Sequence, residues 1–384
     1  MTSVIVIGAG LAGAAAAWRL AQAGHDVTVL ERSRPANEWG SSHGSARIFR
    51  YAYPEASYTR LVLAAASGWD ELGLEHGRPL ITRTGALDFG TTRRPEHLAS
   101  VLAEHGIDHE LLSRDEARAR WDIGFDTPTL WHPGAGVIDA EQAVMAMLES
   151  AVRAGATVLN DQPVERVERT ATGYRVLGSR GRAFDAEQVV VAAGGWLPDL
   201  LGDLALPGGF LDAFPALEVR QEQAYHFPYR DRIGVDAEDP ARSGAVWPTF
   251  IHKSERMQVY GLPGGRDADW RGQKVAEYNG GRRIPSAADH DGVVDDANRR
   301  RVVAYVREFL PSLVPEPYAE TTCLFTNTPT EDFVIDRVDG ITVLAPCSGH
   351  GAKFAPLIGE YALALVEGRD DVPAMFRPSL AAVR

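Results

Sequence analysis

Cysteine is scarce in this chain, which has two, Cys323 and Cys347, in 384 residues. Two thiols exclude a disulfide framework, so we expect a reducing, cytoplasmic setting. Long apolar runs are missing too, since none approaches the roughly 20 residues that a membrane span requires. The first residues also lack the basic start and the apolar core of a secretory signal. We therefore expect neither membrane association nor export.

Basic residues are outnumbered, with 39 Lys and Arg against 52 Asp and Glu and a formal net charge of -13. This balance argues against binding to nucleic acid or to an anionic membrane. The content of 45% hydrophobic and 24% charged residues is normal for a soluble globular enzyme. The chain is longer than the about 250–300 residues at which a single core stops growing, which predicts two lobes. No metal site is expected.

The stretch from residue 4 to residue 32 organises the chain. Val4–Ile7 is short, β-branched and continuously apolar, which is typical of a buried parallel strand. The alanine-rich run Gly13–Ala23 predicts a helix that ends before Gly24. Val27–Leu30 predicts a second strand. A GxGxxG motif therefore lies between a strand and a helix, which is the context that it requires.

Each glycine of this motif has a physical reason. Gly8 permits a tight turn, Gly10 lets a pyrophosphate approach the backbone, and Gly13 lets the helix pack closely on the strand. The helix N-terminus offers free N–H groups to phosphates. Glu31 ends the second strand, where an acid can accept hydrogen bonds from a ribose hydroxyl. The motif predicts dinucleotide binding but does not separate FAD from NAD.

Two further segments have either a functional or an ordinary interpretation. The loop 40–51 is small and polar and then basic, so it is a solvated loop or part of the nucleotide site. The stretch 188–196 predicts a buried strand that ends in the glycine turn Gly194-Gly195-Trp196. Ligands bind in α/β sheets where strands end, so this turn closes over the nucleotide or is a plain strand-to-helix turn.

The rest of the chain alternates between nucleotide-type elements and strand-rich inserts. We expect strands of an antiparallel sheet over 221–227, 245–251 and 257–261, and helices over 57–74, 295–310 and from Asp139 to about Ala154, with Asp139 and Gln142 resembling a capping box. This predicts a discontinuous division, with 1–84, 137–215 and 323–384 in a nucleotide-binding domain and 85–136 and 216–322 in a substrate domain.

A second strand, glycine turn and helix lie near the C-terminus. The strand Ile341–Ala345 leads into residues 347–354, and a helix continues to Val366. The positive end of this helix, with Lys353 beside it, suits a ring that becomes anionic. A flavin becomes anionic at N1 and C2=O on reduction, whereas a nicotinamide does not. The turn therefore favours FAD.

Three segments carry a resemblance to a known family: residues 42–50, 323–328 and 348–354. Together they resemble the monomeric sarcosine oxidase and N-methyltryptophan oxidase family, within the D-amino-acid-oxidase-like flavoproteins. The resemblance covers nearly the whole chain. It implies an α/β (α+β) fold, in which a Rossmann-like FAD domain is covered by a discontinuous antiparallel-sheet substrate domain. It also implies a monomer.

The resemblance implies roles for individual residues. Cys323 matches the cysteine that attaches FAD covalently through an 8α-S-cysteinyl bond. Arg50 and Lys353 match the pair that binds the substrate carboxylate. Arg47 matches an arginine against the flavin, and Lys274 matches the lysine near flavin N5 that activates molecular oxygen.

Other positions carry weaker correspondences. Tyr260 matches an active-site tyrosine, and Tyr278 stands where sarcosine oxidase has an active-site histidine. Phe325 stands where tyrosine is frequent, and Cys347 stands where a larger residue is common. These departures put sarcosine itself in doubt as the substrate. The expected FAD contacts are Gly8, Gly10, Leu11, Ala12, Gly13, Glu31, Arg32, Ser42, His43, Arg47, Val164, Gly194, Trp196, Cys323, Gly349, His350, Gly351 and Lys353.

The expected reaction is oxidation of a secondary or N-methyl amino acid at the carbon next to nitrogen. It gives an imine, which hydrolyses, and hydrogen peroxide. Three alternatives remain open: an oxidase of a cyclic imino acid such as pipecolate, a dehydrogenase of the same fold that uses an electron carrier, and a non-catalytic flavoprotein subunit. The carboxylate-binding pair argues against the last of these.

Overall fold

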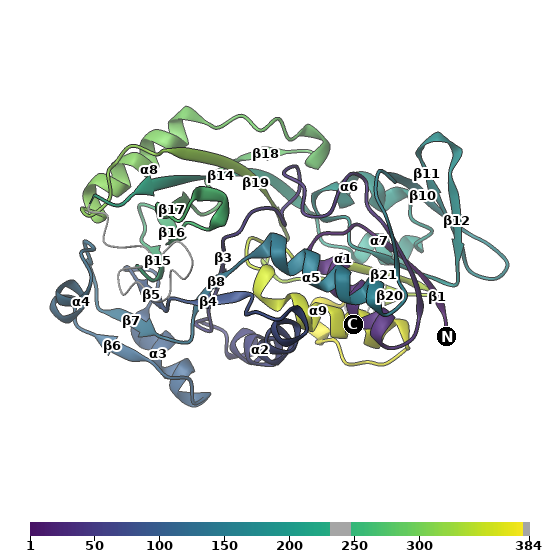
Figure 1. The fold of residues 1–384 in the computed structure, drawn as a ribbon, viewed down its shortest axis with the longest axis horizontal. Helices are drawn as coiled ribbons and strands as arrows, with labels where there is room; N and C mark the ends of the chain where they lie inside the picture. Colours follow the sequence, from purple (N-terminus) through teal and green to yellow (C-terminus); the bar gives the residue numbers. More distant parts are fainter. Residues whose placement is uncertain (231–246, 379–384) are drawn as a thin grey trace.

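The computed structural model describes residues 1–230 and 247–378. Within these ranges the chain forms two lobes, one built on a six-stranded sheet and the other on a nine-stranded sheet (Figure 1). The helices are α1 (Leu11–Gln22), α2 (Ala56–His76), α3 (Pro95–Glu104), α4 (Arg114–Arg120), α5 (Ala140–Arg153), α6 (Leu197–Leu200), α7 (Gly208–Ala213), α8 (Asp296–Phe309) and α9 (Ala355–Val366). In these ranges no helix is both long and apolar enough to cross a bilayer.

The six-stranded sheet has the order β20-β21-β13-β1-β2-β9. All neighbours are parallel except β20 and β21. The strands are β1 (Ser3–Ile7), β2 (Asp26–Leu30), β9 (Thr157–Leu159), β13 (Gln188–Val191), β20 (Val334–Val338) and β21 (Ile341–Ala345). This arrangement confirms the expected Rossmann-like sheet, since β1 lies at its centre with a βαβ unit on one side.

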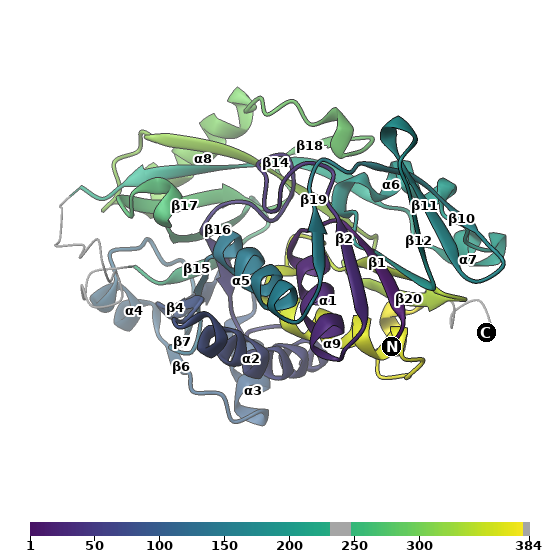
Figure 2. The same ribbon diagram turned by 45° about the vertical axis from the view of Figure 1, so that its right-hand side comes forward.

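Helices α5, α1 and α9 lie side by side against this sheet (Figure 2). The alanines of α1 explain how a helix fits there, because Ala14 to Ala17 are completely buried. Gly359 lets the backbone of α9 approach that of α1, because a Cβ at this position would lie only 2.5 Å from the carbonyl oxygen of Ala15. Small side chains therefore let three helices pack in one layer over the nucleotide-type sheet.

The nine-stranded sheet has the order β18-β14-β17-β16-β15-β5-β7-β6, and β19 also pairs with β14. Its strands are β5 (Ala86–Phe89), β6 (Glu110–Leu112), β7 (Thr129–His132), β14 (Glu218–Pro228), β15 (Thr249–Lys253), β16 (Gln258–Pro263), β17 (Gly272–Glu277), β18 (Arg282–Ile284) and β19 (Ala319–Asn327). Most neighbours are antiparallel, as expected, but β15 pairs with β5 in parallel. Of the strand predicted over 245–251, residues 245 and 246 lie outside the described residues.

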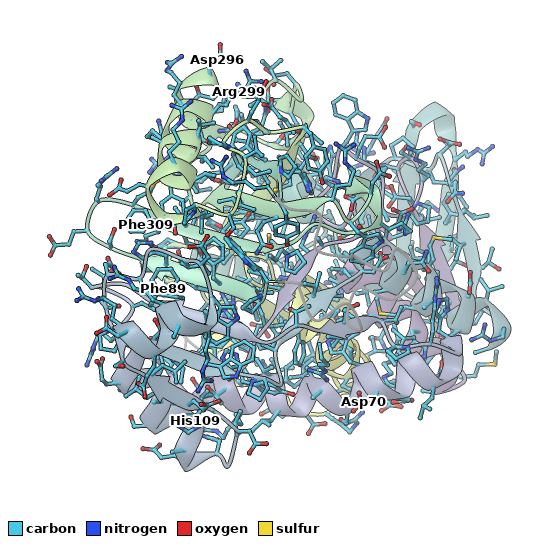
Figure 3. The ribbon with its side chains drawn as sticks, turned by 60° about the vertical axis from the view of Figure 1, so that its left-hand side comes forward. Asp70, Phe89, His109, Asp296, Arg299 and Phe309 are labelled. Atoms are coloured by element: carbon cyan, nitrogen blue, oxygen red, sulfur yellow. The ribbon has the colours of Figure 1, made fainter. Side chains whose placement is uncertain are left out.

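Helix α8 covers the outer side of this sheet (Figure 1). Figure 3 shows Asp296 and Arg299 at one end of α8 and Phe309 at the other end, close to Phe89. The ring of His252 lies 4.4 Å from that of Phe89 and 4.9 Å from that of Phe309. An aromatic cluster therefore fixes α8 to the sheet, which leaves the opposite face of the sheet for the other lobe.

Two small sheets complete the described part. They contain β3 (Arg47–Phe49), β4 (Ile81–Arg83) and β8 (Gly136–Ile138) in one, and β10 (Val164–Arg169), β11 (Tyr174–Gly178) and β12 (Ala183–Ala186) in the other. The expected capping box at α5 is half formed. Asp139 accepts the N–H of Gln142, whereas the Gln142 side chain accepts from Arg78. The expected domain boundaries stay a prediction.

Candidate active site

A cavity of about 910 Å³ is lined by both lobes. It runs from the glycine turn after β1 to the end of β15, and both Gly10 and Gly351 line it. Of the predicted site residues, all line this cavity except Gly13 and His43. The two glycine turns, more than 300 residues apart in sequence, thus face one space.

The first turn has the backbone that its glycines require. Gly8 has a φ of +97°, in the left-handed region. A Cβ at Gly13 would lie 1.9 Å from the carbonyl oxygen of Gly8, so only glycine allows the helix to start this close to the strand. The helix starts at Leu11, two residues earlier than predicted, and the Leu11 N–H donates to Ser42 Oγ at 3.0 Å. Ser42 therefore fixes the loop 40–46 against the helix N-terminus.

Glu31 lies at the end of β2 and is 5% exposed. Its carboxylate accepts the N–H of Ala9 at 2.8 Å and that of Ser33 at 3.0 Å. Burial raises the pKa of Glu31, and these hydrogen bonds oppose the rise. The carboxylate thus links the glycine turn to the second strand, at the wall of the cavity. Next to it, the Arg32 guanidinium lies 4.5 Å from the centroid of the Trp196 ring.

Arg47 is held by the loop that precedes it. Its guanidinium donates to the carbonyl oxygens of Ser41 at 2.9 Å, His43 at 2.8 Å and Ala46 at 2.9 Å. The His43 ring lies behind the cavity wall, where burial and the charges of Arg47 and Lys274 lower its pKa to about 3. The loop backbone therefore fixes the Arg47 guanidinium at this wall of the cavity, beside a neutral His43.

Cys323, Lys274 and Tyr260 lie on the face of the large sheet that lines the cavity. Burial and Arg47 lower the pKa of Lys274 to about 8, while Cys323 and Asp267 oppose this effect. Burial raises the pKa of the Cys323 thiol, although the charges of Arg47 and Lys274 act in the opposite direction. Arg47, Lys274 and Cys323 are therefore close enough for the charge of each to act on the others.

Arg50 and Lys353 meet at Tyr53. The Arg50 guanidinium lies 4.2 Å and the Lys353 ammonium 5.6 Å from the centroid of this ring. Lys353 Nζ donates to the His350 carbonyl oxygen at 2.7 Å. Burial and the charge of Arg50 hold the pKa of Lys353 well below its ordinary value. An anion placed between these two cations would offset that unfavourable burial.

The second glycine turn differs from the prediction in one respect. The turn is followed by a 3₁₀ turn, Ala352–Phe354, before α9 begins at Ala355. A Cβ at Gly351 would lie 1.6 Å from the Pro346 carbonyl oxygen, which accounts for glycine there. Gly349 has a φ of +70° and sits against the ring of Phe325.

Tyr278 and Phe325, the two aromatic residues that depart from the family pattern, form a wall of the cavity. Tyr278 donates to the carbonyl oxygen of Ser348 at 3.2 Å, and its ring centroid lies 5.8 Å from that of Phe325. Cys347 Sγ accepts the N–H of Thr326 at 3.4 Å. These residues shape the space beside Arg50 and Lys353.

Sequence reasoning missed four residues here: Tyr53, Lys253 and Glu331, which line the cavity, and Glu222. Glu222 is 1% exposed and lies opposite Cys323 in the β14–β19 pair, so both side chains share one face. Burial raises its pKa to about 7. The sequence offered little signal for either Glu222 or Lys253, because Glu222 lies among polar residues in β14 and Lys253 ends β15 directly after His252.

The cavity fits FAD in several respects. Gly10 lines the cavity at the start of α1, and the absence of a Cβ there leaves room for Ser42 Oγ, which would lie 3.0 Å from such an atom. The Cys323 thiol and the cations Arg47 and Lys274 line the same cavity as this turn. One dinucleotide can therefore contact the α1 end with its phosphates and the large sheet with its ring system.

Comparisons with known proteins agree with this geometry. The family described as FAD dependent oxidoreductase matches residues 3–365. N-methyl-L-tryptophan oxidase of Yersinia pestis (strain Pestoides F) is 29% identical over 371 residues, covering 94% of this chain and 93% of that protein.

Two solved structures share the fold. NikD, described as an unusual amino acid oxidase essential for nikkomycin biosynthesis, has a TM-score of 0.83 at 24% identity, with 98% of each chain covered. L-proline dehydrogenase from P. horikoshii has a TM-score of 0.80 at 20% identity, covering 98% of this chain and 96% of that one.

Proposed function

The chain belongs to the FAD dependent oxidoreductase family, and on that premise we propose that it is an oxidase of secondary or N-methyl amino acids. The substrate loses a hydride from the carbon next to nitrogen and a proton from the nitrogen, which leaves a C=N bond. Water then hydrolyses the imine to an aldehyde and an amine. Dioxygen takes up the two electrons and two protons and leaves as hydrogen peroxide.

The observation that carries this proposal is the pair of cations at Tyr53. Arg50 can meet a carboxylate with two parallel hydrogen bonds, and Lys353 adds a point charge. At about 4 Å and an effective dielectric constant near 20, each pairing amounts to roughly 4 kcal/mol before desolvation. This favours amino acids over plain amines. The same two charges disfavour an ammonium group beside them, so the amine binds in its neutral form and needs no separate base.

The residues of the two glycine turns and of the loop 40–47 would hold FAD. Bound FAD supplies a two-electron acceptor that dioxygen can reoxidise. Lys274 would then stabilise the anion that forms as oxygen receives its first electron, because a fixed cation in a buried site needs no reorganisation. Its location beside Arg47 and Cys323 supports this role.

Cys323 is the residue that we propose to carry FAD covalently. It lines the cavity with Arg47 and Lys274, whose charges favour the thiolate that such a bond requires. Protein precipitated with acid should stay yellow, and Cys323→Ser should release the flavin into the supernatant. A colourless pellet from the natural protein would contradict the covalent bond but not the oxidase.

A substrate panel tests the reaction itself. Sarcosine, N-methyl-L-tryptophan and pipecolate are mixed with the flavin-loaded protein without oxygen, and the flavin absorbance is followed. At least one should bleach it, and admitted air should restore the colour with one peroxide formed per substrate. Bleaching followed by slow recovery in air would favour a dehydrogenase. No bleaching by any amino acid would contradict the proposal.

A further inference from the structure

Lysine is almost absent from this chain, and all of it lies in one place. Of the 39 Lys and Arg residues, three are lysines: Lys253, Lys274 and Lys353. All three line the cavity. The other basic positions are arginine, so a lysine here is not the usual surface residue. Lys353 and Lys274 have proposed roles, whereas Lys253 has none.

The sheet register directs Lys253 toward the cavity. In the β15–β16 pair, Ile251 lies opposite Tyr260 and Lys253 lies opposite Gln258. Opposed residues of an antiparallel pair point to the same face, and so do residues two apart along a strand. All four of these residues line the cavity. The Lys253 ammonium lies 5.2 Å from the centroid of the Tyr278 ring.

Three cations, Arg50, Lys253 and Lys353, line the same cavity as the aromatic wall. Within residues 1–230 and 247–378, no ion pair involves Arg50, Lys253 or Lys353. A further cation, Arg93, forms an ion pair with Asp88 at 2.6 Å. The carboxylates of Glu55, Glu331 and Asp332 also line the cavity, and the charge of Glu331 acts on Lys253.

A single substrate carboxylate does not account for three cations. Arg50 and Lys353 share Tyr53, whereas Lys253 lies over the ring of Tyr278, which belongs to the aromatic wall. Burial, together with Arg93 and Arg50, lowers the pKa of Lys253 to about 8, although the carboxylates of Glu331 and Asp88 oppose this effect, so its charge is disfavoured in the free protein. A second anionic group on the ligand would remove that penalty.

We propose that Lys253 binds a second anionic group of the substrate, so that the enzyme acts on N-substituted amino dicarboxylic acids. The α-carboxylate binds to Arg50 and Lys353, and the side-chain carboxylate binds to Lys253 beside Tyr278. This inference rests on the proposed function and names the substrate class of the same site.

Matched substrate pairs test the inference. N-methylglutamate is compared with N-methylglutamine, and N-methylaspartate with N-methylasparagine. The quantity compared is the rate constant of anaerobic flavin bleaching divided by the apparent Kd of the substrate. The members of each pair differ in charge but hardly in size. A charge-assisted hydrogen bond predicts that the acid is favoured about 10- to 100-fold in at least one pair. Lys253→Met should bring that ratio close to one, and Lys253→Arg should retain most of it.

A binding measurement separates a direct contact from a structural effect. Glutarate and its monoamide are titrated against the flavin absorbance without turnover. Affinity for glutarate should fall above about pH 8 as Lys253 loses its proton. Because the pKa of Lys353 is lowered as well, the part of the fall that Lys253→Arg moves to higher pH is the part that belongs to Lys253. Arg256→Met is the matched control, since Arg256 is exposed and pairs with Glu308. It should keep the acid-to-amide ratio of the natural protein.

Two results would overturn the inference. If monocarboxylic N-methyl amino acids bleach the flavin but neither pair shows a preference for the acid, the oxidase stands and Lys253 has another role. The same holds if the preference survives Lys253→Met. If no amino acid bleaches the flavin, the proposed function fails and this inference fails with it.

Discussion

Replacing Lys274 with methionine should stabilise the protein, although it removes the cation that we assign to oxygen. Lys274 is 6% exposed, and its pKa falls from an ordinary value of 10.5 to about 8. Burial is the main cause, and the charge of Arg47 adds to it. Methionine has a similar length and no charge, so the substitution removes the buried charge while most of the packing volume stays.

The magnitude follows from the pKa difference between the folded and unfolded chain. At 1.36 kcal/mol per unit, a difference of about 2.5 units gives roughly 3 kcal/mol at pH 7, where the lysine is charged in both states. Between about pH 8 and 10.5 the unfolded chain still holds a proton that the folded chain has released. The free energy of unfolding of the natural protein therefore rises with pH relative to Lys274→Met. By pH 9.5 the gap between them should shrink to about 1.5 kcal/mol.

Urea unfolding of the flavin-loaded proteins, followed by tryptophan fluorescence at pH 7, 8 and 9.5, measures this gap. A change in packing would shift the difference in unfolding free energy between the two proteins by the same amount at every pH. The decrease of this difference from pH 7 to pH 9.5 is therefore the quantity that tests the buried ammonium group. Arg256→Met removes an exposed charge and should show no comparable dependence. A gap for Lys274→Met that stays constant or widens between pH 7 and 9.5 would refute the assignment of a buried, destabilised ammonium group.

Three further substitutions test other parts of the site. Arg50→Ala should raise the KM for the amino acid on the order of 10²–10³-fold, because it leaves the substrate carboxylate without its fork of donors; unchanged kinetics would exclude it from the binding pair. Gly13→Ala places a Cβ 1.9 Å from the Gly8 carbonyl oxygen, so the variant should purify with little bound flavin and a lower melting temperature. A variant that purifies with a full complement of flavin would show that the turn can move to accommodate the Cβ. The free energy of unfolding of Glu222→Gln should rise relative to that of the natural protein between about pH 4.5 and 7, by up to roughly 3 kcal/mol, because the folded chain holds the Glu222 proton to a higher pH than the unfolded chain does. Urea unfolding at pH 5 and pH 8 measures this difference. The same difference between the two proteins at both pH values would argue against a buried carboxylate.

The sequence by itself determined the nucleotide-binding half well. Strand β1, the turn at Gly8 and helix α1 lie within two residues of the prediction, because apolar period and glycine conformation act over a few neighbouring residues. Motif matching also pointed to Cys323 and Lys353, which both line the cavity, while their roles stay a prediction. Local chemistry was sufficient in these places.

Only the tertiary structure decided which side chains share the cavity. The parallel pairing of β15 with β5 and the register of β14 with β19 join segments about 100 to 160 residues apart in sequence. No local pattern encodes such a register, because it depends on how two sheets and their covering helices pack together. That packing places Glu222 opposite Cys323 and Lys253 near Tyr278, and it adds Lys253 to the carboxylate-binding pair Arg50 and Lys353 that the motifs indicated.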